Sequence, residues 1–197
     1  MQQDSGLRER LIDVGVELVT TEGSSALGLR EIARRAGVSH GAPRRYFPTH
    51  QALLSAIARR GFEDLGARFP VGPAADGPRG QVRALGHAYV GYALEHRGMF
   101  ELMFRHDLLD GSGQELPPGS RLREFTLPLF ELLVSLVARC DPAGAPRITA
   151  AALWANLHGM AQLWAWGSLP LALDGDPEAS VERIVDAALD AHLPNRP

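Results

Sequence analysis

The segment Leu29–Phe47, LREIARRAGVSHGAPRRYF, decides the fold of this chain. Apolar residues occupy one face of a predicted first helix at positions Leu29, Ile32, Ala33 and Ala36. Gly37 follows where a helix C-terminus favours a left-handed residue, and Ser39 is a good N-cap for a second helix that runs to about Phe47. Two helices joined by a short turn with glycine are typical of the helix-turn-helix motif, whose second helix lies in the DNA major groove.

Basic side chains are concentrated in the same segment. Its cations are Arg30, Arg34, Arg35, Arg44 and Arg45, and its one acid is Glu31. The whole chain carries a formal net charge of −3, so this basic character is local. Arginine neutralises DNA phosphates and pairs bidentately with guanine. Spacing, turn and charge together therefore favour DNA binding over a merely solvated helix face.

Composition restricts the other classes of protein. The 197 residues are 45% hydrophobic, which is enough for a buried core. One cysteine, Cys140, permits neither an internal disulfide nor a zinc cluster and fits a reducing cytoplasm. The first ten residues are polar, so we expect no signal peptide. Residues 148–173 are strongly apolar, but polar residues and two helix breakers interrupt them, so we expect a buried helix and no membrane partner.

Helical spacing recurs along the chain without strand alternation, so the predicted fold class is all-α. We expect about nine helices, near residues 5–21, 29–36, 42–47, 50–69, 81–96, 98–106, 120–139, 146–167 and 177–192. Residues 70–80 and 110–119 are rich in helix breakers and are predicted loops. The predicted domains are residues 1–50, a helix-turn-helix DNA-binding domain, residues 51–69, a connecting helix, and residues 78–197, a helical bundle for ligand binding and dimerisation.

Several short motifs resemble the TetR family of bacterial transcriptional regulators. The matching residues are Ile32-Ala33, Ala36-Gly37-Val38-Ser39, Gly41, Tyr46-Phe47 and Leu53-Leu54. Two further stretches, Gly98–Phe104 and Trp154–Gly159, resemble a C-terminal subfamily named for its Trp-His-Gly segment. The resemblance implies a homodimeric regulator with a helix-turn-helix at one end and a helical bundle at the other.

Four positions depart from the family pattern. Gly28 stands where a threonine or serine cap is usual, and it loses the side-chain bond to the helix. Pro43 lies inside the second helix, whose start we therefore expect near Ala42. Arg44 replaces a commonly aromatic residue, and His50 replaces the usual lysine, which exchanges a fixed charge for a titratable one. These changes affect the base contacts rather than the fold.

The candidate DNA-binding residues form one contiguous set with three outliers. We expect contacts to phosphate or sugar from Arg44, Arg45, Tyr46 and His50, and a groove-lining face made by Ser39, His40, Gly41, Ala42 and Pro43. Arg30 and Arg34 would reach the DNA backbone from the first helix. Phe47 is expected in the core, whereas Arg35 is as readily an ordinary surface residue.

The second half of the sequence suggests a ligand pocket rather than catalysis. Its histidines and carboxylates share no metal-ligand or nucleophile spacing, so we expect no catalytic residue, metal or cofactor. Large soft side chains are frequent there, and they line adaptable apolar pockets as well as cores. The candidate ligand-binding residues are Met99, Phe100, Met103, Phe104, Phe125, Trp154, His158 and Ala161. We expect a small, mainly apolar effector with His158 as a polar handle.

The last two predicted helices are apolar on more than one face, which one chain cannot easily bury. We expect a homodimer through about residues 146–192. A two-fold protein favours an inverted-repeat operator in double-stranded DNA. The sequence thus predicts a cytoplasmic, ligand-responsive regulator, in its simplest form a repressor. Two alternatives remain open: a helical carrier or enzyme that has lost DNA binding, and an architectural DNA-binding protein without a ligand.

Overall fold

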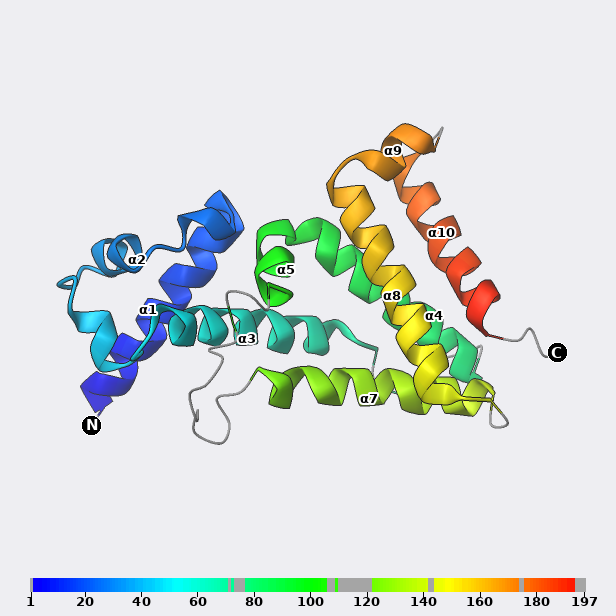
Figure 1. The fold of residues 1–197 in the computed structure, drawn as a ribbon, viewed down its shortest axis with the longest axis horizontal. Coiled ribbons are helices and arrows are strands. Elements are labelled where there is room, and N and C mark those ends of the chain that lie inside the picture. The colour runs from blue at the N-terminus through cyan, green and yellow to red at the C-terminus, as the bar shows by residue number, and fades with distance from the viewer. Residues whose placement is uncertain are drawn as a thin grey trace. The chain divides into compact units, whose positions relative to one another are not determined.

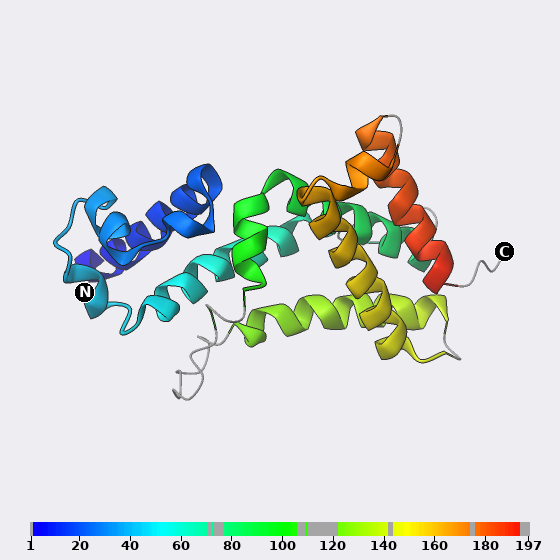
Figure 2. The same cartoon turned by 45° about the horizontal axis from the view of Figure 1, so that its top comes forward.

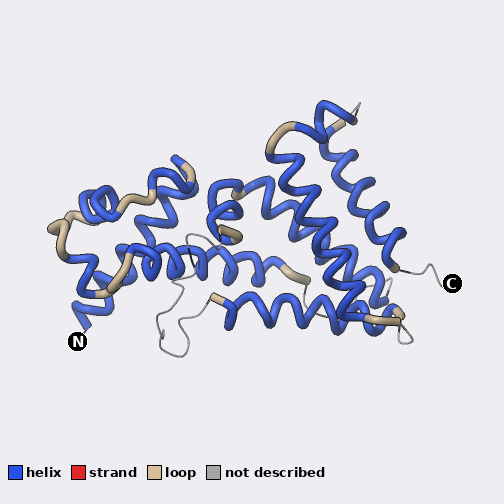
Figure 3. Tube along the Cα trace, in the orientation of Figure 1, coloured by secondary structure: helices blue, strands red, loops and turns tan. Residues whose placement is uncertain are grey.

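A computed structural model describes residues 2–70, 72, 77–105, 109, 122–141, 144–173 and 176–193. Throughout these residues the regular structure is helical, with no strand (Figure 3). The all-α prediction is therefore confirmed. No helix in the described ranges is long and apolar enough to cross a membrane.

The helices follow the chain in the order shown by the colours of Figure 1. The first six elements are α1 (Gln2–Glu22), the 3-10 turn η1 (Ser24–Ala26), α2 (Leu29–Arg35), the 3-10 turn η2 (Ala42–Arg45), α3 (His50–Arg68) and α4 (Gly77–Glu95). They are followed by α5 (Arg97–Met103), α7 (Arg123–Cys140), α8 (Pro146–Ala165), α9 (Ser168–Ala172) and α10 (Pro177–His192). The predicted helix ranges agree with these bounds to within a few residues, except at η2 and at α9, which was not expected. The predicted loop 110–119 and the predicted helix start at residue 120 lie outside the described residues.

The described chain forms two compact units. The first contains Met1–Asp64 and His96–Thr126, and the second contains Leu65–Glu95 and Leu127–Pro197. Residues 96–126, which the sequence analysis placed in the C-terminal domain, thus group with the helix-turn-helix region. The predicted division at residues 50, 69 and 78 stays a prediction.

The first unit is built on close crossings of helices. α1 packs against α2 and α5. A Cβ added to Gly98, in α5, would overlap the carbonyl oxygen of Val19 in α1. A Cβ added to Gly61, in α3, would lie 2.7 Å from the sulfur of Met103. Glycine at these two positions lets α5 lie directly against both helices, which could not approach so closely over a larger side chain.

The second unit is organised around α4, α8 and α10, each of which packs against the other two. α8 and α10 run side by side in both views (Figures 1 and 2). Its buried core includes Leu85, Leu153, Leu157, Val185 and Leu189. At its surface, Arg83 of α4 donates to both carboxylate oxygens of Asp186 of α10 at 2.6 Å. Apolar burial supplies most of the stability here, and the exposed ion pair adds little.

Candidate nucleic-acid interface

Helix α2 ends as its sequence predicts. Gly28 is the N-cap and makes no side-chain capping bond. At the other end the amide of Val38 donates to the carbonyl of Ala33 at 3.0 Å, and the amide of Gly37 donates to the carbonyl of Arg34 at 3.1 Å. This pair of bonds is a Schellman motif, which needs a left-handed residue. Gly37 supplies it with φ +68°.

The second element of the motif is shorter than expected. Instead of an α-helix to Phe47, the chain forms the single turn η2, which starts at Ala42 as predicted but ends at Arg45. Gly41, not Ser39, is its N-cap, so the predicted role of Ser39 as the cap is wrong. Pro43 lies in the first turn, where its missing N–H costs no hydrogen bond. The ring therefore shifts the helix start along the chain and leaves Ser39 in the preceding turn.

Pro43 does not lie on the groove-facing surface. Its side chain is buried in the first turn of η2. The expectation that Pro43 helps to line the groove-facing surface is therefore corrected. The side chains around it do reach the surface: Ser39, His40, Gly41, Arg44 and Arg45 are exposed, and Ala42 and Tyr46 are partly exposed. Phe47 is buried, as predicted for a core residue, with the Arg8 guanidinium 5.3 Å from its ring centroid.

His50 is the first residue of α3 and lies at the edge of a surface hollow. Its Nε2 atom is 2.5 Å from the carbonyl oxygen of Leu27, and because a carbonyl only accepts, Nε2 donates. The hollow has a volume of about 460 Å³ and is lined by Ser24, Ser25, Leu27, Gly28, His50, Gln51 and Leu54. None of these lining residues is acidic, so no negative side chain in the hollow would repel a DNA phosphate near the N-terminus of α3.

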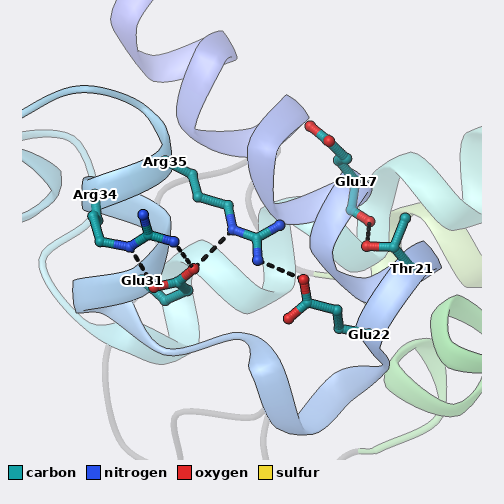
Figure 4. Close-up of polar contacts among 6 residues, drawn as sticks. All are labelled: Glu17, Thr21, Glu22, Glu31, Arg34 and Arg35. Carbon is teal, nitrogen blue, oxygen red and sulfur yellow. Dashed lines mark hydrogen bonds and ion pairs between the residues drawn. The ribbon is translucent and has the colours of Figure 1, made fainter.

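The arginines of the segment divide into two groups. Arg34 and Arg35 both donate to the carboxylate of Glu31, and Arg35 also donates to Glu22 at the end of α1 (Figure 4). Within the described part of the chain, Arg30, Arg44 and Arg45 form no ion pair and are exposed. The surface charge available to a polyanion is therefore carried by these three arginines.

Glu31 and Glu22 are ion-pair partners in this region that were not predicted from the sequence. The spacing of Glu31 to Arg34 and Arg35, three and four residues along a helix, was a readable signal for ion pairs. Glu22 lies 13 residues from Arg35 in the sequence and reaches it only through the packing of α1 on α2. That contact could not be read from the local pattern.

The eight candidate ligand-binding residues fall into the two units. In the first unit Met99, Phe100 and Met103 are buried, and Phe104 meets Phe62 edge to face at 5.6 Å. Phe125, also in the first unit, has the Arg59 guanidinium 5.0 Å from its ring centroid. Trp154, His158 and Ala161 belong to α8 in the second unit, where Ala161 is buried.

Trp154 and His158 share a polar contact with a buried tyrosine. The indole N–H of Trp154 donates to the hydroxyl of Tyr89 at 3.1 Å, and this hydroxyl lies 2.8 Å from Nδ1 of His158. Burial lowers the pKa of His158 and raises the pKa of Tyr89. Both groups are therefore neutral near pH 7, and the Tyr89 hydroxyl can donate to the unprotonated Nδ1. In the described ranges no group of three His, Cys, Asp or Glu side chains could hold a metal.

Comparisons with known proteins agree with this geometry. Residues 11–57 match the family described as bacterial regulatory proteins, tetR family, and residues 82–188 match the tetracyclin repressor-like, C-terminal domain. The chain thus combines a helix-turn-helix unit with the helical C-terminal domain that accompanies it in such regulators. It belongs to the TetR family of bacterial regulatory proteins.

Individual relatives give the same picture. An uncharacterized HTH-type transcriptional regulator of Xanthobacter autotrophicus is 36% identical over 90 residues, which cover 44% of this chain and 45% of that regulator, less than half its length. The structure of a protein with unknown function from Rhodococcus sp. RHA1 is 32% identical, covers 94% of this chain and 93% of that one, and has a TM-score of 0.70. The flavonoid-responsive regulator FrrA shares the fold at 20% identity and a TM-score of 0.61, covering 98% of this chain and all (100%) of that one.

Proposed function

We propose that the protein is a DNA-binding transcriptional regulator that binds an inverted-repeat operator as a homodimer. Family membership supports a regulatory role, and the helix-turn-helix supports double-stranded DNA as the partner. Such a regulator acts on DNA in the bacterial cytoplasm, which is where we place the protein. In its simplest form it is a repressor that occupies the operator without its effector.

The observation that carries the proposal is the arrangement, around the exposed turn, of arginines that form no ion pair with any described residue. Arg44 and Arg45 close η2, Arg30 lies in the first turn of α2, and Ser39–Gly41 are exposed beside them. Cations at the edges suit contacts to the phosphates of both DNA strands, and the small and polar side chains between them can approach the bases. We therefore assign phosphate or base contacts to Arg30, Arg44 and Arg45, and groove contacts to Ser39, His40, Gly41 and Ala42. Tyr46 and His50 complete the proposed contact surface.

We propose α8 as the centre of the dimer interface within residues 146–192. Ile148, Ala152, Ala155, Gly159, Leu163 and Trp166 recur at helical spacing along one face of the helix. Ile148 is 71% exposed and Trp166 is 72% exposed, which is unusual for large apolar side chains in a folded chain. A Cβ added to Gly159 would touch nothing within 4 Å, so the middle of this face is open. Small residues between large ones let the same face of a second copy approach closely.

We propose a small, mainly apolar effector for the C-terminal half. Trp154, at 39% exposure, offers an accessible aromatic surface beside the polar atoms of His158 and Tyr89. Within the second unit, Ala161 of the same helix is the proposed apolar residue of this site. Met99, Phe100, Met103, Phe104 and Phe125 belong to the first unit, and their ligand-binding role stays a prediction. Since one protein of the same fold is named a flavonoid-responsive regulator, flat hydroxylated aromatic compounds are sensible first probes. A panel of such compounds should raise the melting temperature of the wild type and have less effect on Trp154→Ala.

Selection of bound fragments from a random duplex pool tests the DNA-binding proposal. The full chain, without added ligand and near physiological salt, should enrich an inverted repeat. A matched pair of variants makes the result specific: Arg44→Ala should lose enrichment, whereas Arg97→Ala, which removes an exposed arginine at the start of α5, should keep it. Enrichment of no sequence by the wild type would contradict the proposal.

A gel shift of bulk duplex DNA at several salt concentrations, with and without effector, separates the two alternatives. A helical carrier or enzyme that has lost DNA binding would show no salt-dependent shift of bulk duplex DNA. An architectural protein would bind all duplexes alike and would not respond to any effector. Three of the four departures from the family pattern, at Gly28, Pro43 and His50, keep the first alternative open.

A further inference from the structure

The paired arginines of α2 form a closed charge cluster with two carboxylates. The Glu31 Oε2 atom accepts from Arg34 Nε at 2.9 Å, and Oε1 accepts from Arg34 Nη2 at 2.5 Å (Figure 4). The same Oε1 atom accepts from Arg35 Nε at 2.8 Å. Arg35 Nη2 then donates to Glu22 at 2.5 Å. Two positive and two negative groups cancel, so the end of α2 presents no net charge.

Glu31 is the centre of this cluster because its carboxylate holds both guanidinium groups. Its hydrogen bonds from Arg34, and next those from Arg35, lower its pKa to about 2. The carboxylate is therefore charged at every pH at which DNA binding is of interest. Arg34 meets it through two parallel bonds, a geometry that is stronger and more specific than a single contact.

We propose that Glu31 withholds Arg34 and Arg35 from DNA phosphates and thereby limits the affinity that does not depend on sequence. The inference rests on the proposed function as a DNA-binding regulator. In this role Glu31 is a positioning residue: it touches no DNA and acts through the two arginines. Arg34, an expected backbone contact, is then excluded from the interface, and Arg30, Arg44 and Arg45 carry it.

The weakness of exposed ion pairs does not remove this effect. A surface ion pair contributes little to stability, so a DNA phosphate could replace Glu31 as the partner of Arg34. Doing so would leave the Glu31 carboxylate closer to a polyanion with one fewer cation beside it. The exchange gains one attraction and adds one repulsion, so it brings little net affinity. Removing the carboxylate removes this penalty.

A cycle of three variants tests the proposal on random duplex DNA and on the selected operator. The quantity measured is the slope of log Kobs against log salt, since each additional phosphate contact adds about 0.9 to it. Glu31→Gln should steepen the slope, so that the loss of affinity between 50 and 200 mM salt grows about 3.5-fold for one released arginine and about 12-fold for two. The ratio of operator to random-duplex affinity should fall. Arg34→Ala alone should leave the slope unchanged, and the double variant should lose part of the increase.

Glu17→Gln is the matched control. Glu17 is an exposed acid on α1 near the cluster, its backbone carbonyl accepts from the Thr21 hydroxyl, and its carboxylate forms no ion pair with any described residue (Figure 4). It removes the same negative charge without releasing an arginine, so its slope should equal that of the wild type. An equal change in Glu17→Gln and Glu31→Gln would reduce the effect to net charge and overturn the proposal.

Two further results would also overturn it. One is an unchanged slope in Glu31→Gln, and the other is a shallower slope in Arg34→Ala, which would show that Arg34 already contacts phosphate. Circular dichroism and the melting temperature of each variant establish that α2 is intact. If the wild type enriches no operator, the proposed function fails; if it does and Glu31→Gln behaves like the wild type, only this inference fails.

Discussion

At the scale of single residues, Arg45 ends the turn η2 with an exposed guanidinium that forms no ion pair with the residues the structure describes. We expect Arg45→Ala to weaken operator binding by about 1–3 kcal/mol if Arg45 pairs with a base, with relaxed preference at that one position of the site. Titration of the operator and of single-position variants of it measures both quantities. A uniform loss over all duplexes would instead assign Arg45 to phosphate, and no loss would remove it from the interface.

Glu31 also makes a prediction about acid stability. The pKa of Glu31 is about 2 in the folded protein and near 4.5 in the unfolded chain, where the carboxylate has no partner. The unfolded chain therefore binds this proton more readily, and the stability that the pairs contribute is complete above pH 4.5 and is lost as the pH falls through about 2. Glu31→Gln should accordingly lose less stability than the wild type between pH 4.5 and pH 2. Urea unfolding at several pH values tests this, and equal losses in both proteins would contradict it.

The same residue shows what the sequence could and could not predict. The excess of arginine over acid in residues 30–45 correctly located the basic region. It did not show which arginines remain available, since side chains three and four residues apart on α2 neutralise one another and Glu22 joins them from another helix. Burial of Pro43 was likewise hidden, because it depends on the direction in which one short turn is packed.

At the scale of elements, periodic patterns predicted the long helices well. α3, α8 and α10 begin at or next to the expected residues because His50 follows a threonine cap and Pro146 and Pro177 suit the first turn of a helix. The short elements were predicted less well. α9 has five residues and η2 has four, too few for a period to be recognised.

The packing of α5 leads to a prediction on stability. Because a Cβ at position 98 would overlap the backbone of Val19, Gly98→Ala should lower the free energy of unfolding by about 1–3 kcal/mol. Gly91→Ala is the control: Gly91 lies within α4 with open space at its Cβ position, so alanine there should stabilise the protein by about 0.5–1 kcal/mol. Denaturant unfolding of both variants decides the matter, and effects of the same sign would refute the proposed close crossing.

At the scale of the whole molecule, the exposed apolar face of α8 predicts the oligomeric state. An arginine in place of Ala155 would bring a charge into the centre of the proposed interface, where it would meet its own copy. We expect Ala155→Arg to shift the protein from dimer to monomer in sedimentation experiments and to abolish binding to the inverted repeat. Ser135→Arg, which places the same charge on an exposed position of α7, should remain dimeric. A dimeric Ala155→Arg variant would refute the assignment of this face.

The brevity of η2 has a consequence for how a genome is searched. A single turn with a buried proline can present few side chains to the bases, so one copy of the protein recognises only a short base sequence. Such a short sequence recurs many times by chance among about 10⁶ or more competing sites of a genome. Two copies held at a fixed spacing require two such sequences at that spacing, and this combination occurs by chance much less often. The specificity for the operator would then depend less on any one base contact than on the distance between the two helix-turn-helix units of a dimer.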